Sequence, residues 1–397
     1  MRISTVTMFE SSLSSMNRQQ SAFLDVGQQM ATGRRVVNPS DDPQAASRAV
    51  GVSQSMAVSE QYSDARVTAR NALSQEESVL NSVSDAISSA KTLIVQAGNG
   101  TLSDADRSAI ASELRGIYES LIGQANTTNG NGDYLFGGVK DNAPPFVKQN
   151  GVVNYQGADS VRAQQVDSSR QMPVGNSGLE VFSGVHAGSD YVAEATTADD
   201  STLTFTGPSV RNAASDGFGE SYTLTFTDPT TFSVTDRLGN VVLTDTYTAG
   251  EAIEFKGMSI TLEGEPKLDD TIEMTKGQDQ SVFETLENAL AALEAPADTP
   301  AKQADLSNTL SSVSRQLDNS LDNVLTVRAS VGARLNELDV LDTVGGNRTL
   351  NYESTLSELV DLDYAQAISD YTLRQVGLQA SQKTFVDMRG MSLFEML

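Results

Sequence analysis

Residues 364–385 read YAQAISDYTLRQVGLQASQKTF, and the spacing of their apolar residues predicts the seam of a helix. Steps of four and three residues alternate along Tyr364, Ile368, Tyr371, Gln375, Leu378, Gln382 and Phe385. This is the heptad spacing that turns one face of a helix toward a partner helix. The glutamines leave the seam short of apolar surface.

The amino-terminal end carries a matching stripe. The same rhythm runs along Val6, Phe9, Leu13, Met16, Gln20, Phe23, Gly27 and Met30, of which Gln20 and Gly27 are poor seam residues. Neither stripe continues into a segment long enough to bury it locally. We therefore expect the two ends of the chain to pair, antiparallel, as a coiled coil.

The composition argues against several kinds of chemistry. The 397 residues include no cysteine, no tryptophan and one histidine, His186, which we expect in an exposed loop. Zinc sites, thiol nucleophiles, disulfides and histidine proton relays are therefore not expected. The sequence also contains no phosphate-binding glycine loop, serine-nucleophile elbow or metal-spaced ligand cluster. We expect no catalytic, cofactor-binding or metal site.

Charge and hydropathy bound the possible partners. A formal net charge of −25 makes nucleic acid and anionic lipid unsuitable partners. No window approaches the roughly 18 apolar residues of a membrane span, and the first residues lack the pattern of a cleaved signal peptide. We expect a soluble chain that is cytoplasmic or exported by a route that needs no cleaved signal.

Local signals predict where the first helices begin and end. Gly33 should end the first helix near Thr32. Asp42 can cap the next helix, with Pro43 in its first turn. A proline-free run over 45–97 then predicts a rod roughly 80 Å long, at about 1.5 Å per residue.

Between residues 139 and 276 the apolar period changes to two. Residues 202–206 and 222–227 alternate threonine with apolar or aromatic residues, which is typical of half-buried antiparallel strands. A weaker strand-and-turn piece over 152–182 precedes them. We expect an inserted β module with two possible lobes, 139–188 and 189–276.

Residues 310–341 carry the longest heptad stripe. Its successive seam positions are Leu310, Val313, Leu317, Ser320, Val324, Val327, Val331, Arg334, Leu338 and Leu341. This pattern predicts a second rod that packs on the first. Arg334 should lean out of the seam or pair with an acidic neighbour, so that Arg334→Leu keeps or raises stability. Gly345-Gly346-Asn347 is expected to separate this rod from the terminal helix.

The predicted fold class is mainly α, with long antiparallel helical rods, a terminal coiled coil and an inserted antiparallel β module. Residues 1–40 and 347–397 would form an inner coiled-coil domain. Residues 41–138 and 277–346 would form a long-helix bundle, and residues 139–276 an outer β-rich domain.

Both ends of the chain resemble the bacterial flagellin family. The connector 31–38, with the acidic pair that follows it, resembles a turn of that family. Residues 362–365 and 375–380 resemble the family's terminal helix. Three stretches resemble the hook-filament junction branch of the family: Asp42-Pro43, residues 134–138 with 144–146, and residues 153–157. The motif residues on which the resemblance rests are Gly33, Arg34, Asn38, Asp41, Asp42, Pro43, Leu135, Phe136, Gly138, Pro145 and Phe146.

The resemblance implies a structural axial protein of the flagellum, secreted through the flagellar export apparatus without a cleaved signal. It implies a homo-oligomer that joins the hook, through a hook-associated adaptor protein, to flagellin. It also implies a cytoplasmic export chaperone that covers the carboxyl-terminal helix. The assembly interface would consist of Val6, Phe9, Leu13, Met16, Phe23, Met30, Tyr364, Ile368, Tyr371, Leu378 and Phe385.

Three alternatives stay open at this point. A filament flagellin would be the major component of a filament, whereas a junction subunit would be a trace component. A coiled-coil adhesin or tether without a polymer role would use the β module as its binding head. A surface hydrolase on the axial scaffold would need a site built from carboxylates, serine and lysine alone.

Overall fold

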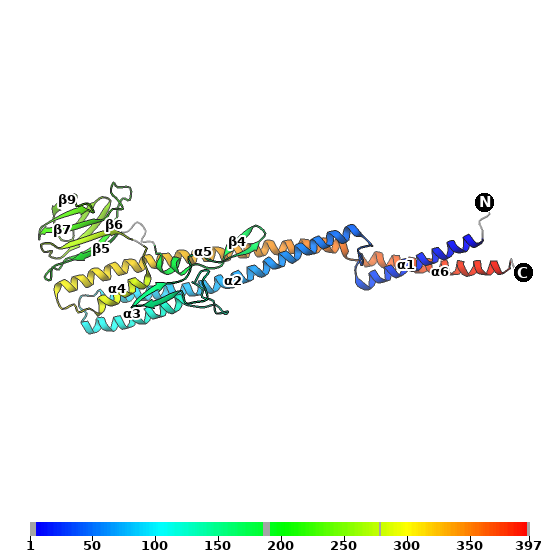
Figure 1. Cartoon of the computed structure of the whole chain (residues 1–397), viewed down its shortest axis with the longest axis horizontal. Helices are drawn as coiled ribbons and strands as arrows, with labels where there is room; N and C mark the ends of the chain where they lie inside the picture. The colour runs from blue at the N-terminus through cyan, green and yellow to red at the C-terminus, as the bar shows by residue number, and fades with distance from the viewer. Residues whose placement is uncertain (1–4, 186–190, 278, 395–397) are drawn as a thin grey trace. The chain divides into compact units, whose positions relative to one another are not determined.

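The computed structural model describes residues 5–185, 191–277 and 279–394, and the chain divides into two compact units (Figure 1). One unit comprises residues 1–64 and 340–397, and the other comprises residues 65–339. His186 lies outside the described residues. The finer three-domain division stays a prediction.

In the first unit, helices from opposite ends of the chain lie side by side. α1 (Thr5–Thr32) and α6 (Tyr364–Phe394) run in opposite directions (Figure 1). The ring centroids of Phe23 and Tyr371 are 4.7 Å apart, and the Leu362 N–H donates to the Gly33 carbonyl at 3.0 Å. The predicted pairing of the chain ends is confirmed.

The start of α2 (Pro43–Ala97) follows the capping signal in the sequence. The carboxylate of Asp42 accepts a hydrogen bond from the Ala45 N–H at 3.0 Å, and this bond is the main cause that lowers the pKa of Asp42. Pro43 is the first helical residue, where a missing N–H costs nothing.

The predicted helix break at Gly345-Gly346-Asn347 is wrong. α5 (Pro300–Val360) continues through these residues for 61 residues in all. A glycine inside a helix costs only about 1 kcal/mol relative to alanine, which a long packed helix tolerates. The chain instead leaves the helix just before Asp363, whose carboxylate caps α6 by accepting from the Ala365 N–H at 2.9 Å and the Gln366 N–H at 3.2 Å.

In the second unit, α2 and α5 lie antiparallel and are joined by ion pairs along their length. Arg70 contacts Asp339 at 2.6 Å, and Arg328 contacts Glu77 at 2.9 Å. Eight of the ten predicted seam positions are buried: Leu310, Val313, Leu317, Ser320, Val324, Val327, Val331 and Leu338. The second rod therefore packs as its heptads predicted. α3 (Asp104–Ala125) and α4 (Val282–Glu294) complete the helical part.

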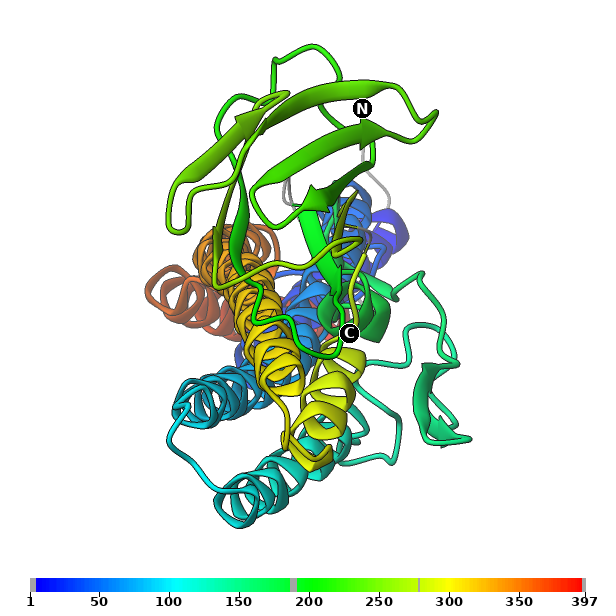
Figure 2. The ribbon, with the colours of Figure 1, turned by 90° about the vertical axis from the view of Figure 1, so that its left-hand side faces the viewer.

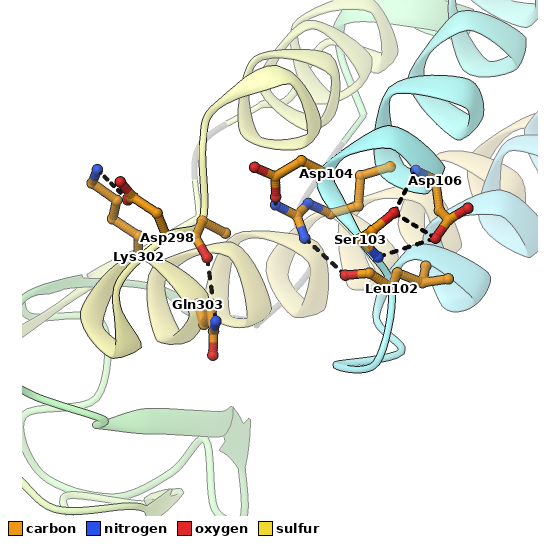
Figure 3. Close-up of polar contacts among 9 residues, drawn as sticks. Leu102, Ser103, Asp104, Asp106, Asp298, Lys302 and Gln303 are labelled. Carbon is orange, nitrogen blue, oxygen red and sulfur yellow. Dashed lines mark hydrogen bonds and ion pairs between the residues drawn. The ribbon is translucent and has the colours of Figure 1, made fainter.

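Local hydrogen bonds close the turns at one end of these helices (Figure 3). Ser103 and Asp106 form a capping box at the start of α3: the Asp106 N–H donates to Ser103 Oγ at 3.3 Å and the Ser103 N–H to Asp106 Oδ2 at 3.1 Å. At the start of α5, Lys302 pairs with Asp298 at 2.6 Å, and Gln303 donates to the Ala297 carbonyl at 3.2 Å.

The β module is a sandwich of two antiparallel sheets, in strand orders β5-β12-β7-β8-β9 and β10-β11-β6. Its strands are β5 (Tyr191–Thr196), β6 (Thr204–Val210), β7 (Tyr222–Asp228), β8 (Thr231–Asp236), β9 (Val241–Thr246), β10 (Ala252–Phe255), β11 (Met258–Glu263) and β12 (Thr271–Lys276). Tyr222, Leu224 and Phe226 alternate with exposed or half-buried threonines and point into its core. The predicted period of two is confirmed.

A smaller lobe precedes the sandwich. It contains the hairpins β1 (Phe146–Gln149) with β2 (Val152–Tyr155) and β3 (Ala163–Asp167) with β4 (Arg170–Pro173), followed by a π-helical turn, η1 (Leu179–Ser183).

The sandwich lies against the start of α5 (Figure 2). Asn308 of α5 is 4 % exposed. Its side chain accepts from the Phe205 N–H at 2.9 Å and donates to the Leu203 carbonyl at 3.2 Å. One amide therefore bonds both kinds of main-chain group where β6 begins, which attaches the sandwich to the helix.

Candidate assembly surface

The contact between α1 and α6 keeps part of the predicted seam and adds neighbouring positions. On α1 the half-buried residues include Met16, Gln19, Phe23, Val26 and Met30, whereas Leu13 and Gln20 are exposed. Gln19 faces Gly377, where an added Cβ would lie 3.3 Å from the Gln19 Oε1 atom. The predicted position Gly27 also faces α6, since an added Cβ there would lie 3.9 Å from the Tyr371 ring, so the α1 seam is broader than the predicted stripe.

The predicted stripe on α6 consists of two rows, in each of which the residues are seven apart. Only one of these rows meets α1. Tyr371, Leu378 and Phe385, seven residues apart, are half-buried. The other row is exposed, and Ile368 keeps 53 % of its surface. Tyr364 is 52 % exposed but still contacts α1, because its hydroxyl donates to the Met30 carbonyl at 3.5 Å.

The remaining predicted interface residues, all on α1, are Val6, Phe9 and Leu13. The side chains of Val6 and Phe9 lie outside the described residues. Leu13 is 38 % exposed, so it borders the seam without being covered by it.

Further apolar residues of both helices face away from the seam. Leu24 is 61 % exposed on α1, and Leu373, Val376 and Val386 are 67 %, 58 % and 64 % exposed on α6. Leu373 is two residues beyond Tyr371, which is about 200° around the helix. A helix that is apolar on several sides is typically covered on several sides. These residues were missed in the sequence because they lie off the heptad; counting apolar residues outside the stripe would have found them.

The connector between α1 and α2 is fastened to the end of α5. Gly33 has φ +71°, a conformation that favours glycine, and Arg34 forms a β-bridge with Asp361. The Arg35 N–H donates to the Val360 carbonyl at 2.7 Å.

The acidic part of the connector closes on itself. The carboxylate of Asp41 accepts from the Val37 N–H at 3.1 Å and the Asn38 N–H at 2.8 Å. The predicted motif residues of this stretch therefore build one turn and hold the backbone in it through these hydrogen bonds.

The motif residues of the smaller lobe meet in an aromatic cluster of the second unit. Phe136 and Phe146 are buried beside Phe182 of η1 and Phe283 of α4, with neighbouring ring centroids 5.1–5.8 Å apart. Pro145 is buried next to Phe146, and Leu135 is half-buried. This cluster joins the lobe to the helices.

Gly138 closes the turn beside this cluster. Its φ is +66°, and an added Cβ would lie 2.2 Å from the Ala158 carbonyl oxygen. The Tyr155 hydroxyl lies 2.8 Å from the same oxygen and 3.1 Å from the Phe136 carbonyl oxygen. Only glycine fits this position, which is the physical reason for its place in the motif.

The described part of the chain shows no group of acidic, histidine or cysteine side chains arranged to hold a metal ion. No helix within the described ranges is long and apolar enough to cross a bilayer.

Comparison with known proteins identifies the chain's relatives. Residues 3–141 match the N-terminal helical region of bacterial flagellin. Over 397 residues the chain is 36 % identical to flagellar hook-associated protein 3 of Salmonella typhimurium, across 100 % of this chain and 99 % of that protein. The chain belongs to the flagellar hook-associated protein 3 family.

Solved structures agree with this placement in the hook-associated protein 3 family. The structure of FlgL from Xanthomonas campestris superposes with a TM-score of 0.73 at 30 % identity, covering 77 % of this chain and 99 % of that one. The flagellar junction protein FlgL of Legionella pneumophila gives a TM-score of 0.72 at 26 % identity, covering 79 % and 100 %. The expected fold class, long helices with an inserted antiparallel β module, is confirmed.

Proposed function

We propose that this chain is a structural, non-enzymatic subunit of the bacterial flagellum that joins the hook to the filament. The observation that carries the proposal is the 36 % identity along the whole chain to a hook-associated protein. A local match would support only a shared fold, whereas this match includes both terminal helices, through which the subunit would assemble.

Polymerisation would proceed through α1 and α6. Their mutual contact leaves Leu24, Ile368, Leu373 and Val376 more than half exposed. Scattered exposed apolar residues are ordinary on a protein surface, but here they lie on several sides of two paired helices. Neighbouring subunits would cover them, at roughly 25 cal/mol for each Å² of apolar surface removed from water.

The subunit's other partners follow from its place in the axial structure. It would contact the hook-associated adaptor protein on one side and flagellin on the other. Before export through the flagellar apparatus without a cleaved signal, a cytoplasmic chaperone would cover α6. The inner domain would comprise residues 1–40 and 347–397, the middle bundle 41–138 and 277–346, and the outer β part 139–276.

Complementation of a deletion strain tests this function. The deletion strain should carry hooks without filaments and lose flagellin to the medium, and the wild-type gene should restore filaments. Leu373→Asp should be exported yet fail to restore them. Leu238→Asp is the matched control, because Leu238 is 82 % exposed in a turn of the β module and should restore filaments fully.

Two results would contradict the proposal. One is a deletion strain with normal filaments. The other is a purified filament in which this chain is the major component, because that result would favour the alternative that the chain is a filament flagellin. Normal complementation by Leu373→Asp would leave the junction role standing but remove the proposed surface.

A further inference from the structure

The second unit buries a carboxyl group that has no hydrogen-bond partner. Glu76 of α2 is 2 % exposed, and neither Oε1 nor Oε2 has a partner among the described residues. Buried polar groups are nearly always hydrogen-bonded, because an unpaired one loses the stabilisation that water gave it. Burial accordingly raises the pKa of Glu76 to about 7.

Glu76 lies beneath the segment that links β4 to η1. An added Cβ on Gly175 would lie 3.9 Å from Glu76 Oε2. The backbone N–H of Asn176 acts as a hydrogen-bond donor toward this carboxyl group and lowers its pKa, although neither carboxylate oxygen has a partner of ordinary hydrogen-bond geometry. The side chain of Asn176 is itself held by Glu180, to which it donates at 2.9 Å.

Arg334 of α5 holds this same segment. Its guanidinium donates to the Gly175 carbonyl at 3.3 Å and to Asn176 Oδ1 at 2.9 Å, and it also reaches the Pro173 carbonyl at 3.4 Å. All three acceptors are uncharged. The charged guanidinium of Arg334 therefore donates its hydrogen bonds to neutral groups of the segment, although the Glu76 carboxyl group lies close enough to interact with it electrostatically.

The other charges around Glu76 do not stabilise its ionised form. Glu180 and Glu77 both raise its pKa, and among the described residues Arg334 is the cation that lowers it. Glu77 has its own cation, because Arg328 donates to its Oε1 atom from Nε at 3.1 Å and from Nη2 at 2.9 Å. Among these charged groups, Arg334 is thus the one that can neutralise ionised Glu76.

We propose that Glu76 and Arg334 form a proton-controlled clamp on residues 173–176. When Glu76 is neutral, Arg334 is free to bind the segment, as the structure shows. When Glu76 loses its proton, the buried negative charge draws the guanidinium toward itself, since an unpaired buried charge is far costlier than a lost hydrogen bond to a neutral acceptor. The segment then loses its clamp and opens more often.

Two backbone amides report on the clamp. The Val174 N–H donates to the Arg162 carbonyl at 3.0 Å, and the Gly178 N–H donates to the Phe136 carbonyl at 2.9 Å. Both should exchange with solvent only when the segment opens. Hydrogen exchange on the full chain, corrected for the intrinsic pH dependence of exchange, should show their protection falling at least about tenfold between pH 5.5 and pH 8.5, as Glu76 loses its proton.

Variants separate the clamp from general loosening. Glu76→Gln cannot ionise, so Val174 and Gly178 should keep the same protection at both pH values. Glu77→Gln is the matched control. The Glu77 carboxylate is next to Glu76 in the sequence but already paired with Arg328, so the tenfold fall in protection should remain in this variant. Equal protection of the wild type at the two pH values overturns the proposal without any variant, and so does a pH-dependent fall that persists in Glu76→Gln.

Discussion

Two helical seams with the same heptad spacing are buried to very different depths. In α5, Leu317, Val331 and Leu338 are fully buried. In α6, Tyr371 is only half-buried, and Ile368 keeps 53 % of its surface exposed. The α5 seam is covered within its own chain, whereas the α6 seam meets a single partner helix. A heptad stripe therefore indicates that a helix has a partner, but not that the partner is present in the same chain.

The largest expected effect is a difference in hydrogen exchange between these seams in the free monomer. Core amides exchange through global unfolding, at roughly 5–15 kcal/mol, whereas marginal segments open at close to zero cost. We expect α1 and α6 to exchange within the shortest labelling time and the 310–341 stretch to be strongly protected. Equal protection of both regions would remove the comparison on which the assembly proposal rests.

Matched leucine truncations should separate stability from assembly. Leu317→Ala removes a fully buried side chain and should destabilise the monomer by about 2–5 kcal/mol. Leu373→Ala removes one that is 67 % exposed and should change stability by less than about 0.5 kcal/mol while impairing polymerisation. Urea unfolding and filament counts measure the two effects. A large stability loss in Leu373→Ala would mean that α6 is already covered in the monomer.

Glu76→Gln should stabilise the second unit in a pH-dependent way. The folded pKa of Glu76, about 7, exceeds its ordinary value of 4.5, so the folded state binds this proton more tightly than the unfolded state. Its contribution is fully present below pH 4.5 and is lost as the pH rises through 7. At pH 8.5 the variant should gain about 3 kcal/mol over the wild type, and near pH 4.5 the gain should vanish. Urea midpoints at the two pH values test this; a gain of the same size at both would exclude ionisation as its cause.

Arg334→Leu should lower stability by about 2 kcal/mol, because the charged donor serves three acceptors of the 173–176 segment. The sequence alone suggested the opposite, since a leucine would complete the apolar seam. Arg334→Lys retains the charge but not the forked geometry and should fall between the two. A melting temperature of Arg334→Leu at or above that of the wild type would restore the simpler expectation.

Removal of the β sandwich should have the smallest effect on assembly. Tyr191 and Lys276 are paired across β5 and β12, so a short linker can replace the strands between them. The excised chain, with Asn308→Ser to avoid an orphaned amide, should still restore filaments because the sandwich has its own core. Export of the excised chain without filament formation would show that the sandwich is part of the joint.

Several features were predictable because neighbouring residues determine them. The cap formed by Asp42 and Pro43 depends on one turn of backbone, and the alternation in residues 222–227 depends on the pleat of a strand. The pairing of the chain ends was predictable for a different reason. Each end carries an apolar stripe that no adjacent segment can cover, so pairing of the two ends is the way to bury both stripes.

The features that the sequence alone did not predict depend on contacts between distant segments. Glycine signals suggested a break at residues 345–347, but α5 continues because packing outweighs a cost of about 1 kcal/mol per glycine. The seam of α1 is broader than the heptad stripe, since Gln19, which lies off the stripe, faces Gly377.

The tertiary structure alone also decided the environment of charged residues. Arg334 occupies a seam position by spacing, yet its partners are carbonyls some 160 residues earlier in the chain. Glu76 is an ordinary helix residue by sequence, and only its burial in the folded chain makes its carboxyl group hard to ionise. By itself, the sequence determined which elements form and that the two ends pair, because periodicity and caps are local. Register, burial and the partners of each charge depended on the shapes of surfaces that meet only once the chain has folded.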